Sequence, residues 1–110
     1  MYARVWRLVV LPEKGEEFAA AVTSALPILR KQPGFRSCLV LRGGPGEKLE
    51  ATVVSTWDSL VALRDSETPA FQKALVHVLS FCEHRPFMRE EEVLVSEFAS
   101  QNLNDTVTKF

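Results

Sequence analysis

The sequence predicts an α+β fold: one antiparallel sheet with helices on one face, built in the order β-α-β-β-α-β. Three observations lead to this prediction. The chain has 110 residues, which is enough for one domain with its own core. Apolar residues alternate in four stretches and recur at helical spacing in two others. Prolines or glycines lie near the changes between these two periodicities, where chain breaks are expected.

The first strand is predicted over residues 2–11, and apolar side chains occupy both of its faces. A sheet with two apolar faces needs cover on both sides. Pro12 ends the strand, and acidic residues follow where the positive end of a helix favours them. The helix carries a core-facing stripe, and we expect Pro27 to bend it. The stripe consists of Phe18, Ala21, Val22, Ala25 and Leu29.

Gln32-Pro33-Gly34 is predicted to end this helix, with Gly34 free to adopt a positive φ. Phe35–Arg42 then forms the second strand and Leu49–Trp57 the third. The intervening Gly43-Gly44-Pro45-Gly46 reads as a hairpin loop rather than a phosphate-binding loop, because no lysine and helix follow it.

Asp58 is expected to cap a short helical turn that runs to Leu63. Thr68-Pro69 begins the second long helix, as an N-cap followed by proline at the first helical position. Arg85-Pro86 ends it. The last strand is predicted over residues 92–98. The apolar stripe of the second long helix consists of Phe71, Leu75, Val78, Leu79 and Cys82.

Two β-α-β halves of this size predict a ferredoxin-like sandwich over residues 1–98. Its second sheet face would remain apolar and bare, which small domains seldom tolerate. We therefore expect a symmetric homodimer through the open sheet face. Residues 99–110 form a polar tail that either is loose or contacts the partner subunit.

Composition excludes several functional classes. Thirteen basic and 14 acidic residues are spread along the chain, so no nucleic-acid-binding surface is expected. No apolar stretch approaches the roughly 18 to 20 residues that span a bilayer, and the N-terminus is strand-like rather than signal-like. Cys38 and Cys82 show no motif spacing and are read as reduced, packed thiols. His77 and His84 are too far apart on a helix for one metal ion. A cytoplasmic protein without a metal is predicted.

Five features follow one another along the chain: Trp6-Arg7, the helix at Phe18, Gln32-Pro33-Gly34-Phe35, Ser55-Thr56-Trp57-Asp58-Ser59 and Phe71-Gln72-Lys73-Ala74. In these features the chain resembles the antibiotic-biosynthesis-monooxygenase-like family of the dimeric α/β-barrel superfamily, over residues 2–98. The resemblance implies a homodimer whose sheets form a barrel, with a small apolar pocket in each subunit between sheet and helices. Some relatives oxidise phenolic or quinol substrates with molecular oxygen, without metal or flavin, so no cofactor is implied.

Other relatives degrade haem. The resemblance implies that those members carry an asparagine on the first strand, a tryptophan at the end of the third and a histidine on the second helix. Trp57 fits the tryptophan, but Trp6 and Leu75 occupy the other two positions. Haem is therefore not expected as a substrate.

Cofactor-free oxygenation requires an apolar pocket that excludes water and a polar group that orients and deprotonates the substrate. Trp57 and His77 are candidate catalytic residues. Trp57, Trp6, Arg7 and Phe71 are candidate substrate-binding residues, and Tyr2 is a further aromatic wall.

Each candidate also has a structural explanation. The tryptophans can serve the core or the dimer face, and His77 can simply be solvated. A non-catalytic dimeric protein that binds a small ligand or acts in stress, and a purely structural dimer with a filled pocket, therefore remain open.

Overall fold

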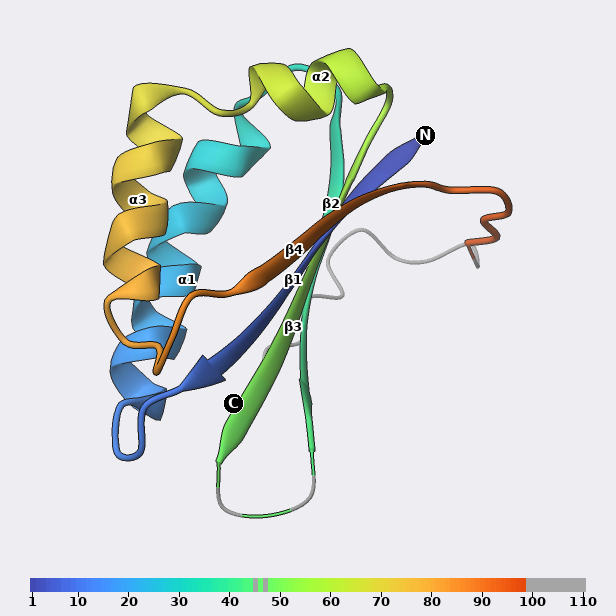
Figure 1. The fold of residues 1–110 in the computed structure, drawn as a ribbon. Coiled ribbons are helices and arrows are strands. Elements are labelled where there is room, and N and C mark those ends of the chain that lie inside the picture. Colours follow the sequence, from blue (N-terminus) through green and yellow to red (C-terminus); the bar gives the residue numbers. More distant parts are fainter. Residues whose placement is uncertain (45, 47, 99–110) are drawn as a thin grey trace.

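The computed structural model of the protein describes residues 1–44, 46 and 48–98. Two long helices, α1 and α3, lie on the same face of the sheet, and the short α2 crosses one end of it (Figure 1). The predicted β-α-β-β-α-β order is confirmed, with α2 preceding α3. The elements are β1 (Tyr2–Val10), α1 (Gly15–Arg30), β2 (Phe35–Gly43), β3 (Leu49–Trp57), α2 (Leu60–Asp65), α3 (Pro69–Leu79) and β4 (Phe87–Glu92).

The four strands form one antiparallel sheet in the order β2-β3-β1-β4. This order confirms the ferredoxin-like α+β class predicted from the sequence. The two central strands, β1 and β3, pair along their whole length, from Tyr2 opposite Trp57 to Val10 opposite Leu49. Residues directly opposite each other project from the same face of the sheet, so the register shows which side chains of β1 and β3 are neighbours.

The core lies between the sheet and the two long helices. Even-numbered positions of β1, such as Leu8 and Val10, face the helices, and Phe18 of α1 is fully buried against them. A second cluster lies at the end of the sheet below α2, where Trp57 packs with Leu29 and Leu63. The first cluster is completed by Ala21, Val22, Ala51 and Val78.

Two of the sequence features, Gln32-Pro33-Gly34-Phe35 and Ser55-Thr56-Trp57-Asp58-Ser59, meet in space. The backbone N–H of Asp58 donates a 2.8 Å hydrogen bond to the carbonyl of Gly34, and Phe35 pairs with Trp57 across β2 and β3. Gly34 adopts φ +81°, as predicted, and a Cβ there would lie 2.6 Å from Cβ of Ala62. Glycine is therefore required both by the backbone and by the close approach of α2.

One strand prediction is wrong. The last strand is β4, Phe87–Glu92, so only Glu92 of the predicted range 92–98 belongs to it and residues 93–98 lie beyond it. All six β4 residues are exposed, because an edge strand is held by backbone pairing to β1 on one side and needs no apolar alternation. The apolar run that suggested the later strand is solvated instead: Leu94 is 86% and Val95 is 88% exposed.

The cap predicted for the short helix is also corrected. Ser59, not Asp58, caps α2, since its Oγ accepts a 3.1 Å hydrogen bond from the backbone N–H of Ala62. Asp58 pairs instead with Arg36 of β2. The prediction for α3 is confirmed: Thr68 Oγ1 accepts from the N–H of Phe71 at 3.2 Å, and Pro69 follows it.

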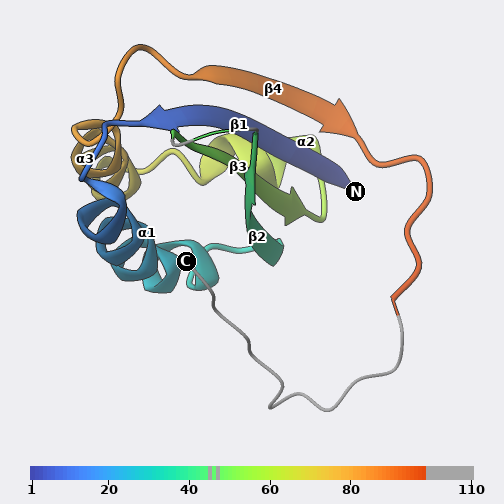
Figure 2. The same cartoon turned by 90° about the horizontal axis from the view of Figure 1, so that it is seen from below.

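The second face of the sheet is bare in the described part of the chain, because all the helices lie on the opposite side (Figure 2). Leu39, Leu41 and Phe87 remain 58%, 50% and 60% exposed. The prediction for the tail at residues 99–110 lies outside the described residues, as do Pro45 and Glu47. None of the helices described is both long enough and apolar enough to cross a membrane.

Candidate functional site

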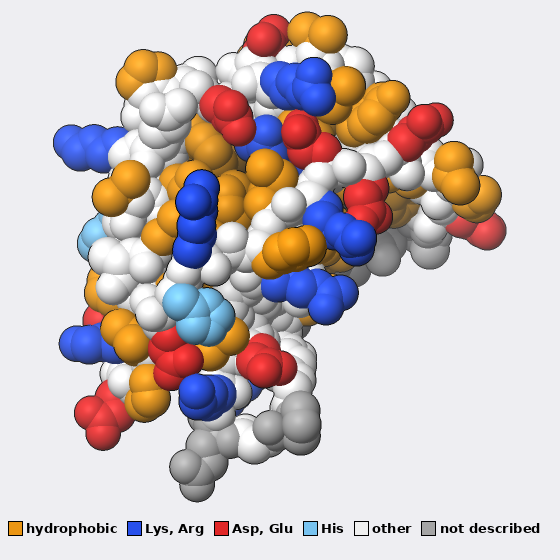
Figure 3. Space-filling model, viewed as in Figure 1, with side chains coloured by type: hydrophobic (Ala, Val, Ile, Leu, Met, Phe, Trp, Pro, Cys, Tyr) orange, Lys and Arg blue, Asp and Glu red, His pale blue; other side chains and the backbone are white. Residues whose placement is uncertain are grey.

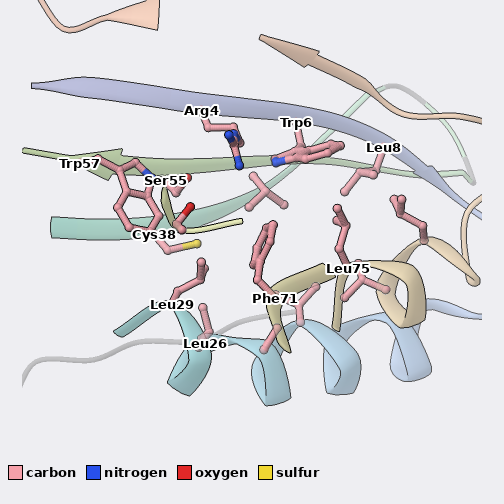
Figure 4. Close-up of a pocket in the computed structure, with 16 residues that line it drawn as sticks. Arg4, Trp6, Leu8, Leu26, Leu29, Cys38, Ser55, Trp57, Phe71 and Leu75 are labelled. Carbon is pink, nitrogen blue, oxygen red and sulfur yellow. Dashed lines mark hydrogen bonds between the residues drawn. The ribbon is translucent and has the colours of Figure 1, made fainter. Parts of the chain in front are cut away.

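A cavity of about 70 Å³ lies between the inner face of the sheet and helices α1 and α3 (Figure 4). In the space-filling view, apolar side chains are visible in a recess between α3 and β4, below α2 (Figure 3). The walls of the cavity are almost entirely apolar. They are formed by Arg4, Trp6, Leu8, Val22, Ala25, Leu26, Leu29, Cys38, Val53, Ser55, Trp57, Ser66, Phe71, Leu75, Val78 and Leu79.

Three aromatic side chains enclose the cavity from different elements. Trp6 comes from β1, Trp57 from the end of β3, and Phe71 from the first turn of α3 (Figure 4). Trp57 is only 1% exposed and packs edge-on against Phe35, with ring centroids 5.3 Å apart. The arrangement suits a flat, apolar ligand, because aromatic rings pack favourably edge-to-face or offset.

Trp57 is also oriented by a hydrogen bond. Its indole Nε1–H donates to Oγ of Ser55 at 3.0 Å, and both groups are buried. The Ser55 hydroxyl accepts this bond and keeps its own proton, which it can donate to another acceptor. Trp57 therefore serves the core and the cavity wall together.

Arg4 is the one basic residue among the cavity-lining residues of the described chain. Its side chain is 4% exposed, and its Nη2 lies 2.9 Å from Glu67 Oε1 and 3.8 Å from Glu90 Oε2. Glu90 also lies 3.5 Å from Nε of Arg64. These carboxylates neutralise much of the charge that burial of a guanidinium would otherwise leave uncompensated.

The Nε atom of Arg4 is buried and has no hydrogen-bond partner. A buried donor left unpaired destabilises a protein by about 1–3 kcal/mol, and by more when it is charged. In Figure 4 the guanidinium lies on the sheet side of the cavity, beside Ser55 and Trp6, with Phe71 on the helix side. The wall of the cavity thus includes a buried cationic side chain with one unsatisfied donor.

The remaining polar groups of the wall are inert or already bonded. Ser66 Oγ donates to the carbonyl of Leu63 at 2.5 Å. Burial raises the pKa of the Cys38 thiol to about 11, so this thiol is neutral near pH 7 and is a poor nucleophile. Both described cysteines are free.

The structure brings together three of the sequence-predicted site residues, Trp6, Trp57 and Phe71, around the cavity. Tyr2 packs against the cluster that contains Trp57 but does not line the cavity. Arg7 is exposed on the opposite sheet face, because its parity in β1 differs from that of Trp6. His77 is exposed on α3, with its ring centroid 5.2 Å from that of Phe81.

Arg4 and Ser55 are the site residues that sequence reasoning missed. A signal existed, since Arg4 shares the parity of Trp6 and Leu8, which face the core. A charged residue at an inward position of a central strand is rare without a specific partner. Ser55 could be placed only through the register, which sets it directly opposite Arg4.

Two chemical consequences follow from this set of residues. The lining residues of the described chain include no carboxylate and no imidazole, so the cavity offers stabilisation of an anion rather than a base in direct contact. Across residues 1–44, 46 and 48–98, no group of three or more His, Cys, Asp or Glu side chains could hold a metal ion.

Comparison with known proteins agrees with this architecture. The sequence model of the family described as antibiotic biosynthesis monooxygenase matches residues 1–76. This range includes β1, α1, β2, β3, α2 and the start of α3, and with them Arg4, Trp6, Ser55, Trp57 and Phe71. A search of curated proteins gave no match.

Solved structures show the same fold at low sequence identity. SnoaB, a cofactor-independent oxygenase from Streptomyces nogalater, is 18% identical, with a TM-score of 0.71 over 94% of this chain and 97% of that one. A proposed antibiotic biosynthesis monooxygenase from Nitrosomonas europaea is 14% identical, with a TM-score of 0.75 over 86% and 100%. Rv0793 from Mycobacterium tuberculosis is 17% identical, with a TM-score of 0.69 over 86% and 96%.

Proposed function

Because the chain belongs to the antibiotic biosynthesis monooxygenase family, we propose that it is a cofactor-independent monooxygenase. Its substrate is a small phenolic or quinol-type molecule, oxidised by molecular oxygen in the cavity between sheet and helices. The observation that carries this proposal is the apolar cavity enclosed by Trp6, Trp57 and Phe71, with one buried cation in its wall. SnoaB, with the same fold, is a cofactor-independent oxygenase.

The reaction balances without an external reductant. A phenolate transfers one electron to dioxygen, and the resulting radical pair combines to form a carbon–oxygen bond. The peroxide takes up the proton that the phenol released, and then loses water and leaves a quinone, so phenol and O₂ yield quinone and H₂O. The substrate supplies all four electrons that reduce O₂, which is why its anion must be stabilised and why competing protonation by water must be limited.

The residues divide this work between them. Trp6, Trp57 and Phe71 hold the ring and exclude water from it. Arg4 stabilises negative charge on the substrate oxygen, because its guanidinium is buried in the cavity wall. His77, the sequence-based candidate for proton transfer, is exposed on α3, and we assign it no role in the reaction.

The same proposal includes a homodimer through the bare sheet face. Leu39 and Leu41 of β2 and Phe87 of β4 are exposed apolar side chains at the two edges of that face, on the side opposite the cavity. Pairing two such faces would remove these side chains from water and would give the barrel that the family resemblance implies.

Oxygen uptake tests the reaction directly. Purified, metal-stripped protein is assayed against a panel of hydroquinones, naphthols and anthrone-like phenols, with Trp57→Phe as the matched variant. Uptake above the uncatalysed rate, reduced in Trp57→Phe while the fold is retained, supports the proposal. Absence of uptake across the panel with folded protein contradicts it for these substrates.

A second function is favoured by one specific observation. No carboxylate or imidazole lines the cavity in the described chain, and its 70 Å³ is well below the roughly 300–1,000 Å³ of common small-molecule sites. A dimeric protein that binds a small aromatic ligand without turning it over fits these two facts. Saturable quenching of tryptophan fluorescence by a ligand, without oxygen uptake, would identify it.

A further inference from the structure

The buried guanidinium of Arg4 has carboxylate partners at one nitrogen atom and no hydrogen-bond partner at another. Nη2 faces the carboxylates of Glu67 and Glu90, at 2.9 and 3.8 Å, whereas the buried Nε has no partner. Arg4 is 3% exposed, so bulk water does not supply the missing bond. An unsatisfied buried cationic donor lowers the stability of the fold. The role of Arg4 in an ion pair therefore does not explain why its Nε atom lacks a partner beside a cavity.

Ser55 provides a second donor at the same place. It lies directly opposite Arg4 in the β1–β3 register, so the two side chains are neighbours on the inner sheet face. Its oxygen accepts from Trp57 Nε1, which leaves the hydroxyl proton available. Two adjacent donors within apolar walls form a site for one oxygen that carries negative charge.

The charges around Arg4 limit the size of that negative charge. The groups that face it are Glu67, which follows α2, and Glu90 of β4, and Arg64 of α2 faces Glu90 in turn. Two carboxylates and two guanidiniums balance. The site therefore suits a monoanion and disfavours a phosphate dianion, which Glu67 and Glu90 would repel.

From these observations, together with the proposed function, we propose that the cavity binds aromatic monoanions, with the charged oxygen held by Arg4 Nε–H and the Ser55 hydroxyl. The ring then lies between Trp6, beside the guanidinium on the sheet side of the cavity, and Phe71 on the helix side (Figure 4). A phenolate and an aromatic carboxylate share this chemistry. The limited volume favours a single ring.

Binding of 4-nitrophenol tests the inference without requiring turnover, since its absorbance shows whether the bound molecule is ionised. We expect the wild-type protein to bind the phenolate at least about tenfold more tightly than the phenol, which lowers the apparent pKa of the bound probe by about one unit. Titration with 4-nitrobenzoate in parallel distinguishes a carboxylate ligand from a phenolate.

Three variants separate an anion site from a structural ion pair. Arg4→Met should abolish the preference for the ionised probe. Arg4→Lys, which keeps a charge but lacks Nε–H, should weaken the preference for the ionised probe about tenfold. This variant replaces Arg4→Met in the test if Arg4→Met does not fold. Glu67→Gln should tighten phenolate binding by about two- to fivefold, because a competing carboxylate is removed. Arg42→Met, at an exposed strand arginine, is the control.

The outcomes are distinct. An ionisation shift that is present in wild type and Arg42→Met but lost in Arg4→Met or Arg4→Lys supports the inference, even if no oxygen is consumed. An equal shift in all folded variants, or no binding of either probe to wild type, overturns it. Oxygen uptake that does not depend on Arg4 would leave the proposed function standing and the inference refuted.

Discussion

The indole Nε1–H of Trp57 donates a 3.0 Å hydrogen bond to Oγ of Ser55, two residues earlier on the same face of β3. Ser55 in turn lies opposite Arg4 in the neighbouring central strand. A residue of the second core cluster, Trp57, is thereby linked to the only basic group among the described cavity-lining residues. Fold stability and the chemistry of the site share these three side chains.

The first prediction concerns that hydrogen bond. Ser55→Ala leaves the indole N–H buried without a partner and should lower the free energy of unfolding by about 1–3 kcal/mol. Trp57→Phe removes the donor but keeps an aromatic ring. The double variant should therefore lose about 1 kcal/mol less than the sum of the two single losses, measured by denaturant unfolding.

Strict additivity would contradict a bond between Trp57 and Ser55. Trp57→Ala is a poor substitute in this cycle. Truncation of a buried tryptophan costs about 3–5 kcal/mol through the cavity it leaves, and that loss would obscure the hydrogen bond.

The second prediction concerns the turn that joins the two sequence motifs. Gly34→Ala forces a Cβ to within 2.6 Å of Cβ of Ala62, at φ +81°. We expect a loss of more than about 1 kcal/mol in the free energy of unfolding, measured in urea. Gly43→Ala is the matched control, because no atom lies within 4 Å of its added Cβ and its φ is not positive.

Ala62→Gly separates the two causes of that loss. In the double variant the steric conflict disappears and only the backbone strain at position 34 remains, so part of the lost stability should return. A Gly34→Ala protein as stable as wild type would show that α2 does not pack on the turn as described.

The elements that the sequence predicts well are those with strong local chemistry. Gly34 is required by its backbone, Thr68 caps α3 as its position before Pro69 indicates, and Leu49–Trp57 is the strand that its β-branched and apolar residues predict. Trp57 combines a strand end with a motif, so both its burial and its place at the cavity could be anticipated.

The parts that escape prediction depend on partners distant in the chain. β4 contains mostly charged residues and forms only because the edge of β1 is available to pair with it. The ion pairs of Arg4 depend on Glu67 and Glu90, which lie more than sixty positions away along the chain. His77 has suitable chemistry for proton transfer, but its side chain lies on the exposed face of α3.

The third prediction tests the dimer. Leu39→Glu places a charge on the bare sheet face, where Leu39 is 58% exposed, and should convert a dimer to monomers in analytical ultracentrifugation. Val76→Glu is the control, since Val76 is 70% exposed on α3, on the other side of the molecule. A wild-type monomer, or a dimer that tolerates Leu39→Glu, would contradict assembly through this face.

The fourth prediction follows from the buried thiol of the cavity wall. Burial raises the pKa of Cys38 from 9.0 to about 11, so at pH 8 its thiolate fraction is about a hundredfold below that of an ordinary cysteine. Alkylation by iodoacetamide in a Cys82→Ser background should be slow at pH 8. It should accelerate about tenfold per pH unit until the pH nears 11.

The same shift predicts how stability changes with pH. Between about pH 9 and 11 the folded chain keeps the Cys38 proton, whereas the unfolded chain releases it. Because the folded state then binds more protons, the free energy of unfolding falls as pH rises through this window, and the contribution is fully present below pH 9. Cys38→Ala should lack this part of the pH dependence. An alkylation midpoint near pH 9 in the folded protein would show that the thiol is solvated and that the cavity wall at β2 is open.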